Sequence, residues 1–256
     1  MRVRASFVPD PVSAARLHGP LAVALALCLA PIACTRVEDS PRPATPGFVQ
    51  AADTPRPVQG SPAGRPGDWL LAFVDVETTG LVPGWHEMID IGMVVTDLEG
   101  VPLDSLFLRI QPEHPERLSE GARAVNAFDA AAWRRHGALA PAAAADSIVR
   151  FRQRVAGTRD VLMVAYNCQF DTAFLDHLFR GSDRTWRELF HYYVLDLPSM
   201  AWALGHRELG GSALNARLGV ADETHVPEEH TGVTGAAFNV HFYRALLARG
   251  ARRAAR

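Results

Sequence analysis

The chain has 256 residues, of which 48% are hydrophobic, a length and composition typical of one sizeable globular domain with appendages. Its formal net charge of -2 excludes a general electrostatic attraction to nucleic acid, so any such binding depends on where individual charges lie. All basic side chains are arginine. Several of them gather at residues 249–256, which we expect to be a solvated basic tail.

Residues 1–34 differ in composition from the rest of the chain. Arginines precede an apolar run over residues 21–33, which is too short to span a bilayer and is typical of the hydrophobic region of a signal peptide. The run ends at Cys34 in a pattern that resembles a bacterial lipoprotein signal. The sequence therefore predicts export to the periplasm or the cell envelope, with a membrane link only through a lipid on Cys34. The alternative is a start site assigned too far upstream, in which case the protein is cytoplasmic.

A proline-rich segment follows over residues 35–68. It has few large apolar side chains and cannot bury enough surface to fold, so we expect a disordered linker. Only Cys168 lies beyond it, which excludes an intrachain disulfide in the folded part.

Residues 69–248 have the regular pattern of one folded domain. Apolar runs bounded by turn residues predict strands at Trp69–Val76, Met88–Thr96, Leu103–Ile110, Val161–Ala165 and Tyr193–Leu195. Alanine-rich or helically spaced segments predict helices near Ser119–Phe128, Ala144–Val155, Thr172–Arg180, Pro198–Leu204, Gly211–Leu218 and Thr234–Ala248. The first three strands form an antiparallel meander, whereas the later strands alternate with helices and favour parallel pairing. We therefore expect an α/β fold with a central mixed five-stranded sheet flanked by helices.

The first strand carries two acids near its end. Asp75 and Glu77 stand at alternate positions of an apolar strand and therefore project to the same face. Two neighbouring carboxylates repel each other unless a cation joins them, and oxygen ligands without cysteine or histidine nearby favour Mg²⁺ or Mn²⁺ over Zn²⁺. The alternative for this segment alone is an edge strand with two solvated acids.

Two later segments carry further candidate groups. Asn167 follows the fourth strand, and Phe170 and Asp171 come in the first turn of the next helix, where an acid also complements the helix dipole. His230 lies in a loop just before the last helix, although a single histidine is a weak signal. Asp196 precedes a proline-led helix, and we expect it to be an N-cap rather than a ligand.

Together, the three segments resemble the motifs of the DEDD-type 3′-to-5′ exonuclease superfamily, histidine subclass, which includes the proofreading subunit of replicative DNA polymerase, oligoribonuclease and ribonuclease T. The first motif, Asp-x-Glu-Thr-Thr-Gly-Leu, is met from Asp75 to Leu81, and the second, Asn-x-x-Phe-Asp, from Asn167 to Asp171. The third motif has a histidine and, five residues later, an aspartate. His230 matches this histidine, but the aspartate position is Gly235.

The resemblance implies a ribonuclease H-like fold and a site for two divalent cations, Mg²⁺ or Mn²⁺. It implies that Asp75 bridges both ions, that Glu77 binds the first and that Asp171 supports the second. His230 would be the general base, a role suited to an unperturbed pKa near neutrality. For the substrate, the motif positions imply contacts from Thr78, Leu81, Asn167 and Phe170, although core packing is a nearly equal alternative for Leu81 and Phe170.

Gly235 removes the fourth carboxylate of the family's pattern. Asp222, Glu228 and Glu229 are near it in sequence, and the sequence favours none of them as a replacement. The first hypothesis is a metal-dependent 3′-to-5′ exonuclease acting on single-stranded DNA or RNA ends or short oligonucleotides, weakened by this loss. The second is a degenerate exonuclease fold that binds nucleic-acid ends without cutting them. The third is an envelope lipoprotein that reuses the fold for protein contacts.

Overall fold

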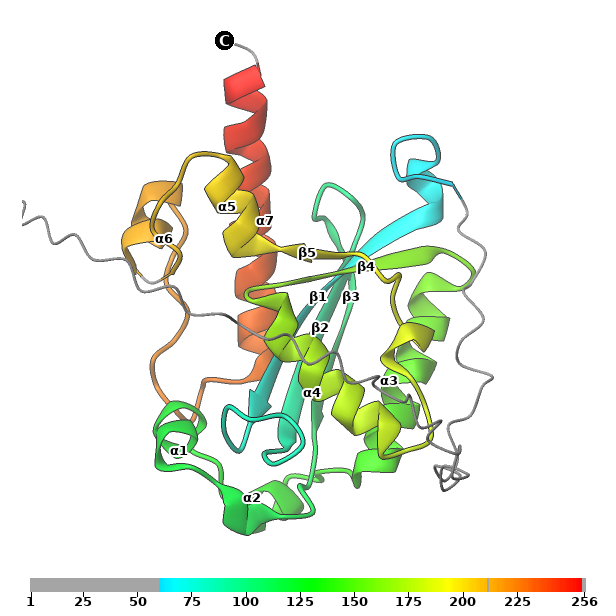
Figure 1. Ribbon diagram of the computed structural model, residues 1–256, viewed down its shortest axis with the longest axis vertical. Coiled ribbons are helices and arrows are strands. Elements are labelled where there is room, and N and C mark those ends of the chain that lie inside the picture. Colours follow the sequence, from blue (N-terminus) through cyan, green and yellow to red (C-terminus); the bar gives the residue numbers. More distant parts are fainter. Residues whose placement is uncertain (1–59, 211, 255–256) are drawn as a thin grey trace, which may run out of the picture. The chain divides into compact units, whose positions relative to one another are not determined.

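A computed structural model describes residues 60–210 and 212–254, which form an α/β fold around a mixed five-stranded sheet (Figure 1). The strands are β1 (Trp69–Thr78), β2 (Met88–Thr96), β3 (Pro102–Arg109), β4 (Asp160–Ala165) and β5 (Val194–Asp196). Their order in the sheet is β3-β2-β1-β4-β5. The pairs β1–β2 and β2–β3 are antiparallel, whereas β1–β4 and β4–β5 are parallel. The predicted fold class and the antiparallel meander are confirmed.

Seven α-helices and three short 3₁₀ helices connect and cover the strands in these residues. The α-helices are α1 (Glu120–Asn126), α2 (Ala130–Arg135), α3 (Pro141–Ala156), α4 (Cys168–Arg180), α5 (Leu197–Ala203), α6 (Ser212–Leu218) and α7 (Gly232–Ala254). The 3₁₀ helices are η2 (Pro66–Asp68), η3 (Pro115–Arg117) and η4 (Trp186–Glu188). None of the helices in the described part of the chain is long and apolar enough to cross a membrane.

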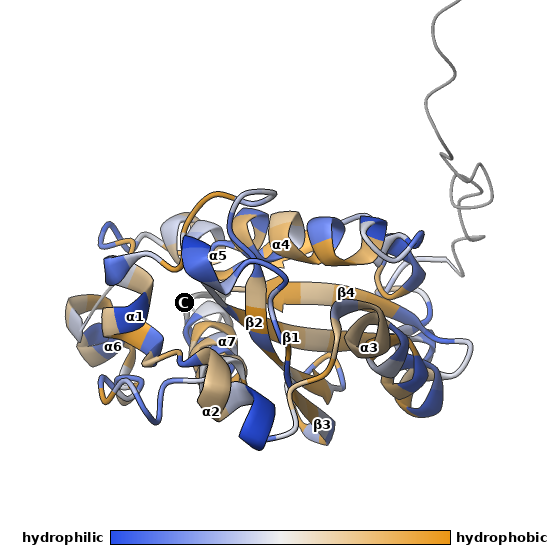
Figure 2. Ribbon diagram, turned by 90° about the horizontal axis from the view of Figure 1, so that it is seen from below, coloured by the Kyte–Doolittle hydropathy of each residue, from blue (hydrophilic) through white to orange (hydrophobic). Residues whose placement is uncertain are grey.

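An apolar core lies on each face of the sheet, because alternate residues of a strand point to opposite sides. On one face, the even-numbered residues of β1 from Leu70 to Val76 pack with α3 and α4. On the other face, the odd-numbered residues from Trp69 to Phe73 pack with α5, α6 and α7. Figure 2 shows the central strands coloured mostly as hydrophobic, whereas α4 alternates between hydrophobic and hydrophilic residues. The same alternation carries Asp75 and Glu77 to the face covered by α7.

Strand β1 extends beyond its parallel partner. The β1–β4 ladder ends at the pair Phe73 and Val164, while the β1–β2 ladder continues to Thr78 and Met88. The carboxyl end of β1 is therefore paired on one side only. Polar side chains can approach it from the other side, as is usual for ligand sites in open α/β sheets.

Several boundaries differ from those expected from the sequence. Helix α7 continues to Ala254, so residues 249–254 are helical rather than a separate basic tail, in keeping with the strong helix propensity of alanine, arginine and leucine. Regular structure begins before residue 69, with η2 at the end of the segment expected to be a linker. Helix α2 was not predicted, although Asp129 caps it by accepting from the Ala132 amide at 2.6 Å. The signal-like segment, Cys34 and most of the linker lie outside the described residues and stay predictions.

The start of α7 lies directly against the backbone of the sheet. A Cβ atom at Gly92 of β2 would overlap the backbone of Gly232 and Val233, and a Cβ at Gly232 would overlap the backbone of β1 and β2. Side chains normally keep a helix and a sheet apart. Here two glycines let the backbones touch, which brings the N-terminus of α7 to the carboxyl end of β1.

Replacing Gly92 with alanine should destabilise the protein by about 1–3 kcal/mol or more, because the new methyl group meets backbone atoms that no side-chain rotation can move. Urea unfolding measures the change. Gly121→Ala is the matched control, since a Cβ there has no neighbour within 4 Å. It should be neutral or stabilise the α1 helix by up to ~1 kcal/mol. Equal unfolding midpoints for Gly92→Ala and the wild type would refute the contact.

Candidate active site

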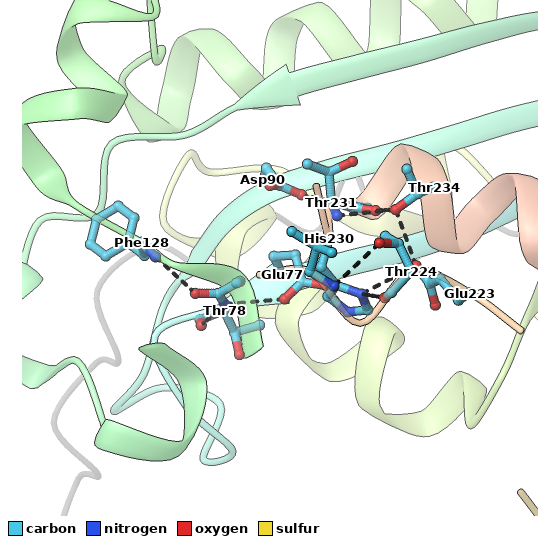
Figure 3. A network of polar contacts seen from close by, with 12 residues as sticks. Glu77, Thr78, Asp90, Phe128, Glu223, Thr224, His230, Thr231 and Thr234 are labelled. Carbon is cyan, nitrogen blue, oxygen red and sulfur yellow. Dashed lines mark hydrogen bonds and ion pairs between the residues drawn. The ribbon is translucent and has the colours of Figure 1, made fainter. Parts of the chain in front are cut away.

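The carboxyl end of β1 presents Glu77 to a histidine from the loop before α7. Glu77 is buried, and its Oε1 lies 3.0 Å from His230 Nε2. On the other side of the ring, His230 Nδ1 lies 3.2 Å from the Thr224 carbonyl oxygen and 3.5 Å from Glu223 Oε1. Figure 3 shows His230 between Glu77 and Glu223. The structure thus brings together two predicted site residues and an acid that the sequence did not indicate.

Asn126 at the end of α1 holds the other oxygen of Glu77. Its side-chain amide donates to Glu77 Oε2 and to the Thr78 carbonyl oxygen, both at 3.1 Å. Asn126 is buried, so these bonds are shielded from water. No sequence signal identified this residue, because the contact joins positions 49 residues apart.

The contact with Glu77 changes the chemistry expected of His230. The hydrogen bond that His230 donates to Glu77, together with the charges of Glu77 and Glu223, raises the pKa of His230 to about 9, against the opposing effect of burial. The pKa of His230 in this arrangement is therefore not the unperturbed one to which the role of general base is suited. His230 is protonated at neutral pH here and has to part from Glu77 before it can accept a proton.

Asp75 and Asp171 approach each other at the site from β1 and from the first turn of α4. Burial and mutual repulsion with Asp171 and Glu77 raise the pKa of Asp75 well above its usual value. Burial also raises the pKa of Asp171, against hydrogen bonds with the backbone of its own residue and of Val76. The charge of Asp171 thus raises the pKa of Asp75, whereas the charges of Glu77 and Asp196 raise the pKa of Asp171. Buried acids in such surroundings lack sufficient positive charge, which a bound cation would supply.

Asp90 of β2 is a further buried acid at the site. Its Oδ1 accepts a hydrogen bond of 2.9 Å from the Gly232 amide at the first residue of α7, and its Oδ2 has no partner among the described residues. Burial raises the pKa of Asp90 to about 7, with a smaller increase from Glu77 and a decrease from the Gly232 amide. Asp90 therefore fixes the N-terminus of α7, a role that only the structure shows.

The turn after β1 uses several residues of the first motif. Thr78 Oγ1 donates to the Gly80 carbonyl oxygen at 2.7 Å, and a Cβ at Gly80 would overlap the His86 ring. Beyond the turn, the Leu81 side chain is 80% exposed. The Thr78 hydroxyl is thus engaged within the turn, whereas Leu81 is free of the core.

The second motif divides between surface and core. Asn167 is exposed, adopts a left-handed conformation with φ of 68° at the start of α4, and lines a cavity of about 780 Å³ together with Arg180 and Tyr192. Phe170 is partly buried and packs on Phe174 at a centroid distance of 4.8 Å. Much of the Phe170 ring is therefore in contact with the core, whereas Asn167 faces solvent.

Asp196 is an N-cap, as predicted. Its Oδ2 accepts from the Ser199 amide at 3.0 Å at the start of α5, and its Oδ1 accepts from the Cys168 amide at 3.2 Å at the start of α4.

Gly235 lies against Asp75. A Cβ atom at Gly235 would overlap Oδ2 and Cγ of Asp75, so the Asp75 carboxylate occupies the space into which a side chain at position 235 would start. Both residues line a cavity of about 310 Å³ together with Glu223 and Asn239. In the family's pattern an aspartate stands at position 235. Here that position borders a cavity beside the carboxyl end of β1.

The residues present suit hard divalent cations. Carboxylate oxygens from Asp75, Glu77, Asp171 and Glu223 converge on one region, and these are the ligands that Mg²⁺ and Mn²⁺ prefer. Across residues 60–210 and 212–254, no three His, Cys, Asp or Glu side chains are yet positioned to hold one ion. Glu77 pairs with His230 instead, so binding requires that side chain to turn.

No family model matches the sequence, and no curated protein matches it. Solved structures of exonuclease I are similar to this chain in fold. One exonuclease I structure, described as suggesting how processivity is achieved, matches with a TM-score of 0.59 at 16% identity. The match covers 72% of this chain and 42% of the exonuclease I chain. E. coli exonuclease I with a dT13 oligonucleotide gives 0.59 at 15% identity, with the same coverage of 72% and 42%. A zinc-bound complex of E. coli exonuclease I with single-stranded DNA gives 0.58 at 17% identity, covering 72% and 41%.

This chain spans less than half the length of those exonuclease I chains. At such low identity the likeness shows the fold. The protein shares the mixed five-stranded α/β fold of exonuclease I, which agrees with the predicted fold class.

Replacing Asp90 with asparagine should flatten the pH dependence of stability between about pH 4 and pH 7. The pKa of Asp90 rises from 3.8 to about 7 on folding, so its stabilising contribution is complete below about pH 4 and declines as the pH rises toward 7. Asparagine does not titrate, and its oxygen can still accept from the Gly232 amide. Urea unfolding in EDTA should show the variant gaining on the wild type by on the order of 1–3 kcal/mol between pH 4 and pH 8. Parallel stability curves would contradict this assignment.

Proposed function

We propose that this protein is a metal-dependent 3′-to-5′ exonuclease that hydrolyses phosphodiester bonds at the ends of single-stranded nucleic acid. The observation that carries the proposal is the meeting of Glu77 and His230, 3.0 Å apart, beside the buried acids Asp75 and Asp171. Three separate segments of the chain supply these groups at the carboxyl end of β1. The fold shared with exonuclease I supports the same reaction class.

Asp75, Glu77 and Asp171 would hold two divalent cations, Mg²⁺ or Mn²⁺. When bound, such ions lower the pKa of a water molecule and stabilise charge on the scissile phosphate. Within the chain, Asn126 orients Glu77, and the Thr224 carbonyl oxygen accepts from His230 and orients its ring. Once Glu77 has turned from His230, the pKa of the ring falls and Nε2 can release its proton to solvent, so that the neutral imidazole can then accept a proton as a general base.

Exposed apolar side chains near the site offer a surface for the terminal bases. Leu81 is 80% exposed and Trp85 is 56% exposed, and both lie in the loop after β1. The Arg117 guanidinium lies 4.3 Å from the centroid of the Trp85 ring. Stacking on such side chains tolerates any base, which suits an enzyme without sequence preference. Asn167 is exposed at the start of α4 and is a candidate for a phosphate contact.

Gly235 favours a second candidate, a fold that binds nucleic-acid ends without cleaving them. The loss of one carboxylate weakens a magnesium site, because Mg²⁺ demands near-ideal octahedral coordination. The two candidates share the substrate and differ only in the chemical step.

The full-length chain should shorten a 5′-labelled single-stranded oligonucleotide from its 3′ end in Mg²⁺ or Mn²⁺. Asp75→Asn should lower the rate by about 10²–10³-fold, since it removes one of the carboxylates that would hold the ions. Asp104→Asn is the control. Asp104 lies on β3 and forms an exposed ion pair with Arg154 of α3, so its loss should leave the rate unchanged. A wild-type chain that binds the oligonucleotide but leaves it intact in both metals would support the second candidate instead.

A further inference from the structure

The cavity beside Gly235 is the place where the site lacks a ligand. Its volume is about 310 Å³, and it is lined by residues that include Asp75, Asp222, Glu223, His225, Gly235 and Asn239. We call it the Gly235 cavity.

A side chain at position 235 cannot fill this cavity while Asp75 stays where it is. The Asp75 carboxylate rests on the Cα of Gly235, and even a Cβ there would overlap Asp75 Oδ2. An acid that completes the site has to reach the cavity from another segment.

Glu223 reaches it from the loop before α7. Its side chain is partly buried, and its Oε1 accepts a hydrogen bond of 3.1 Å from Thr234 Oγ1, one residue before Gly235. Its charge also acts on Asp75, which places the two carboxylates in one electrostatic environment. Glu223 therefore lies at the rim of the cavity with its carboxylate turned toward the start of α7.

The other acids of the same loop are engaged elsewhere or exposed. Asp222 is exposed, and its Oδ1 accepts from Asn215 Nδ2 at 2.7 Å. Glu229 is exposed and accepts from Thr224 Oγ1 at 3.2 Å, while Glu228 is exposed as well. Of the acids between positions 222 and 229, only Glu223 is both partly buried and directed at the cavity.

A second group in the cavity also lacks a partner. Asn239 is 1% exposed and lies one helical turn after Gly235. Its Nδ2 donates to the Val74 carbonyl oxygen at 3.3 Å, which leaves Oδ1 without a hydrogen-bond partner in the described structure. A buried acceptor without a donor is costly, and a hydrated cation in the cavity would supply one.

We propose that Glu223 supplies the fourth carboxylate of the metal site, reaching the Gly235 cavity from the loop that precedes α7. This inference rests on the proposed function for its metal, and it assigns a ligand that lies outside the three motifs. In this assignment the acid comes from a loop and not from α7, and the lack of a side chain at Gly235 leaves room for Asp75.

Binding of Mn²⁺ to the full-length chain tests this assignment without any measurement of catalysis. The free Mn²⁺ signal in electron paramagnetic resonance gives the number of bound ions and their affinities. Glu223→Gln keeps the size of the side chain and an oxygen for the Thr234 hydroxyl, but removes the charge. We expect it to weaken one Mn²⁺ site by about 10–100-fold. Asp222→Asn, in the same cavity but held by Asn215, should change the affinity by less than about threefold, within the range of a surface charge.

The outcomes separate this inference from the proposed function. If Glu223→Gln binds Mn²⁺ as the wild type does, or if the wild type binds none, Glu223 is not a ligand. If wild-type binding depends on Glu223 but the oligonucleotide is not shortened, the ligand assignment stands and the exonuclease proposal fails. Thermal melts in EDTA check that both variants fold like the wild type. Partial recovery of Mn²⁺ affinity in Glu223→Asp would support a direct role for the carboxylate.

Discussion

The backbone contact between the first turn of α7 and the strands β1 and β2 sets the positions of His230 and Gly235 relative to the acids of β1. Gly92 and Gly232 allow the two backbones to touch, and Asp90 joins them through the Gly232 amide. His230 lies two residues before this contact and Gly235 three residues after it. Because α7 is fixed at this point, His230 is held against Glu77 and Gly235 against Asp75.

The alternating direction of side chains along β1 allowed Asp75 and Glu77 to be predicted from the sequence as neighbours in one site. A strand with apolar residues on both faces places Asp75 and Glu77 on one side, and the structure shows them facing α7. The five strands were predicted to within a few residues, because apolar runs and turn residues are local signals. Asp196 was correctly separated from the acids of the site for the same reason, since an N-cap depends on its own helix.

The remaining groups depend on contacts between distant segments. Asp90 meets Gly232 across 142 positions and Asn126 meets Glu77 across 49, so no local pattern could connect them. Glu223 lies in a loop, where neither helical nor strand periodicity indicates which way a side chain points. The raised pKa of His230 also depends on such contacts, because it follows from Glu77 and Glu223 on the two sides of the ring.

The charge balance of the site explains why His230 pairs with Glu77. Asp75, Asp90 and Asp171 are buried together, and burial raises the pKa of each. The imidazolium of His230 and the positive end of the α7 dipole offset part of the negative charge. Divalent cations would compete with His230 for Glu77, because both interact with the same carboxylate. Under the proposed function, Glu77 would therefore serve in two ways: paired with His230 it shares a proton across a 3.0 Å contact, and turned away from His230 it would be a metal ligand.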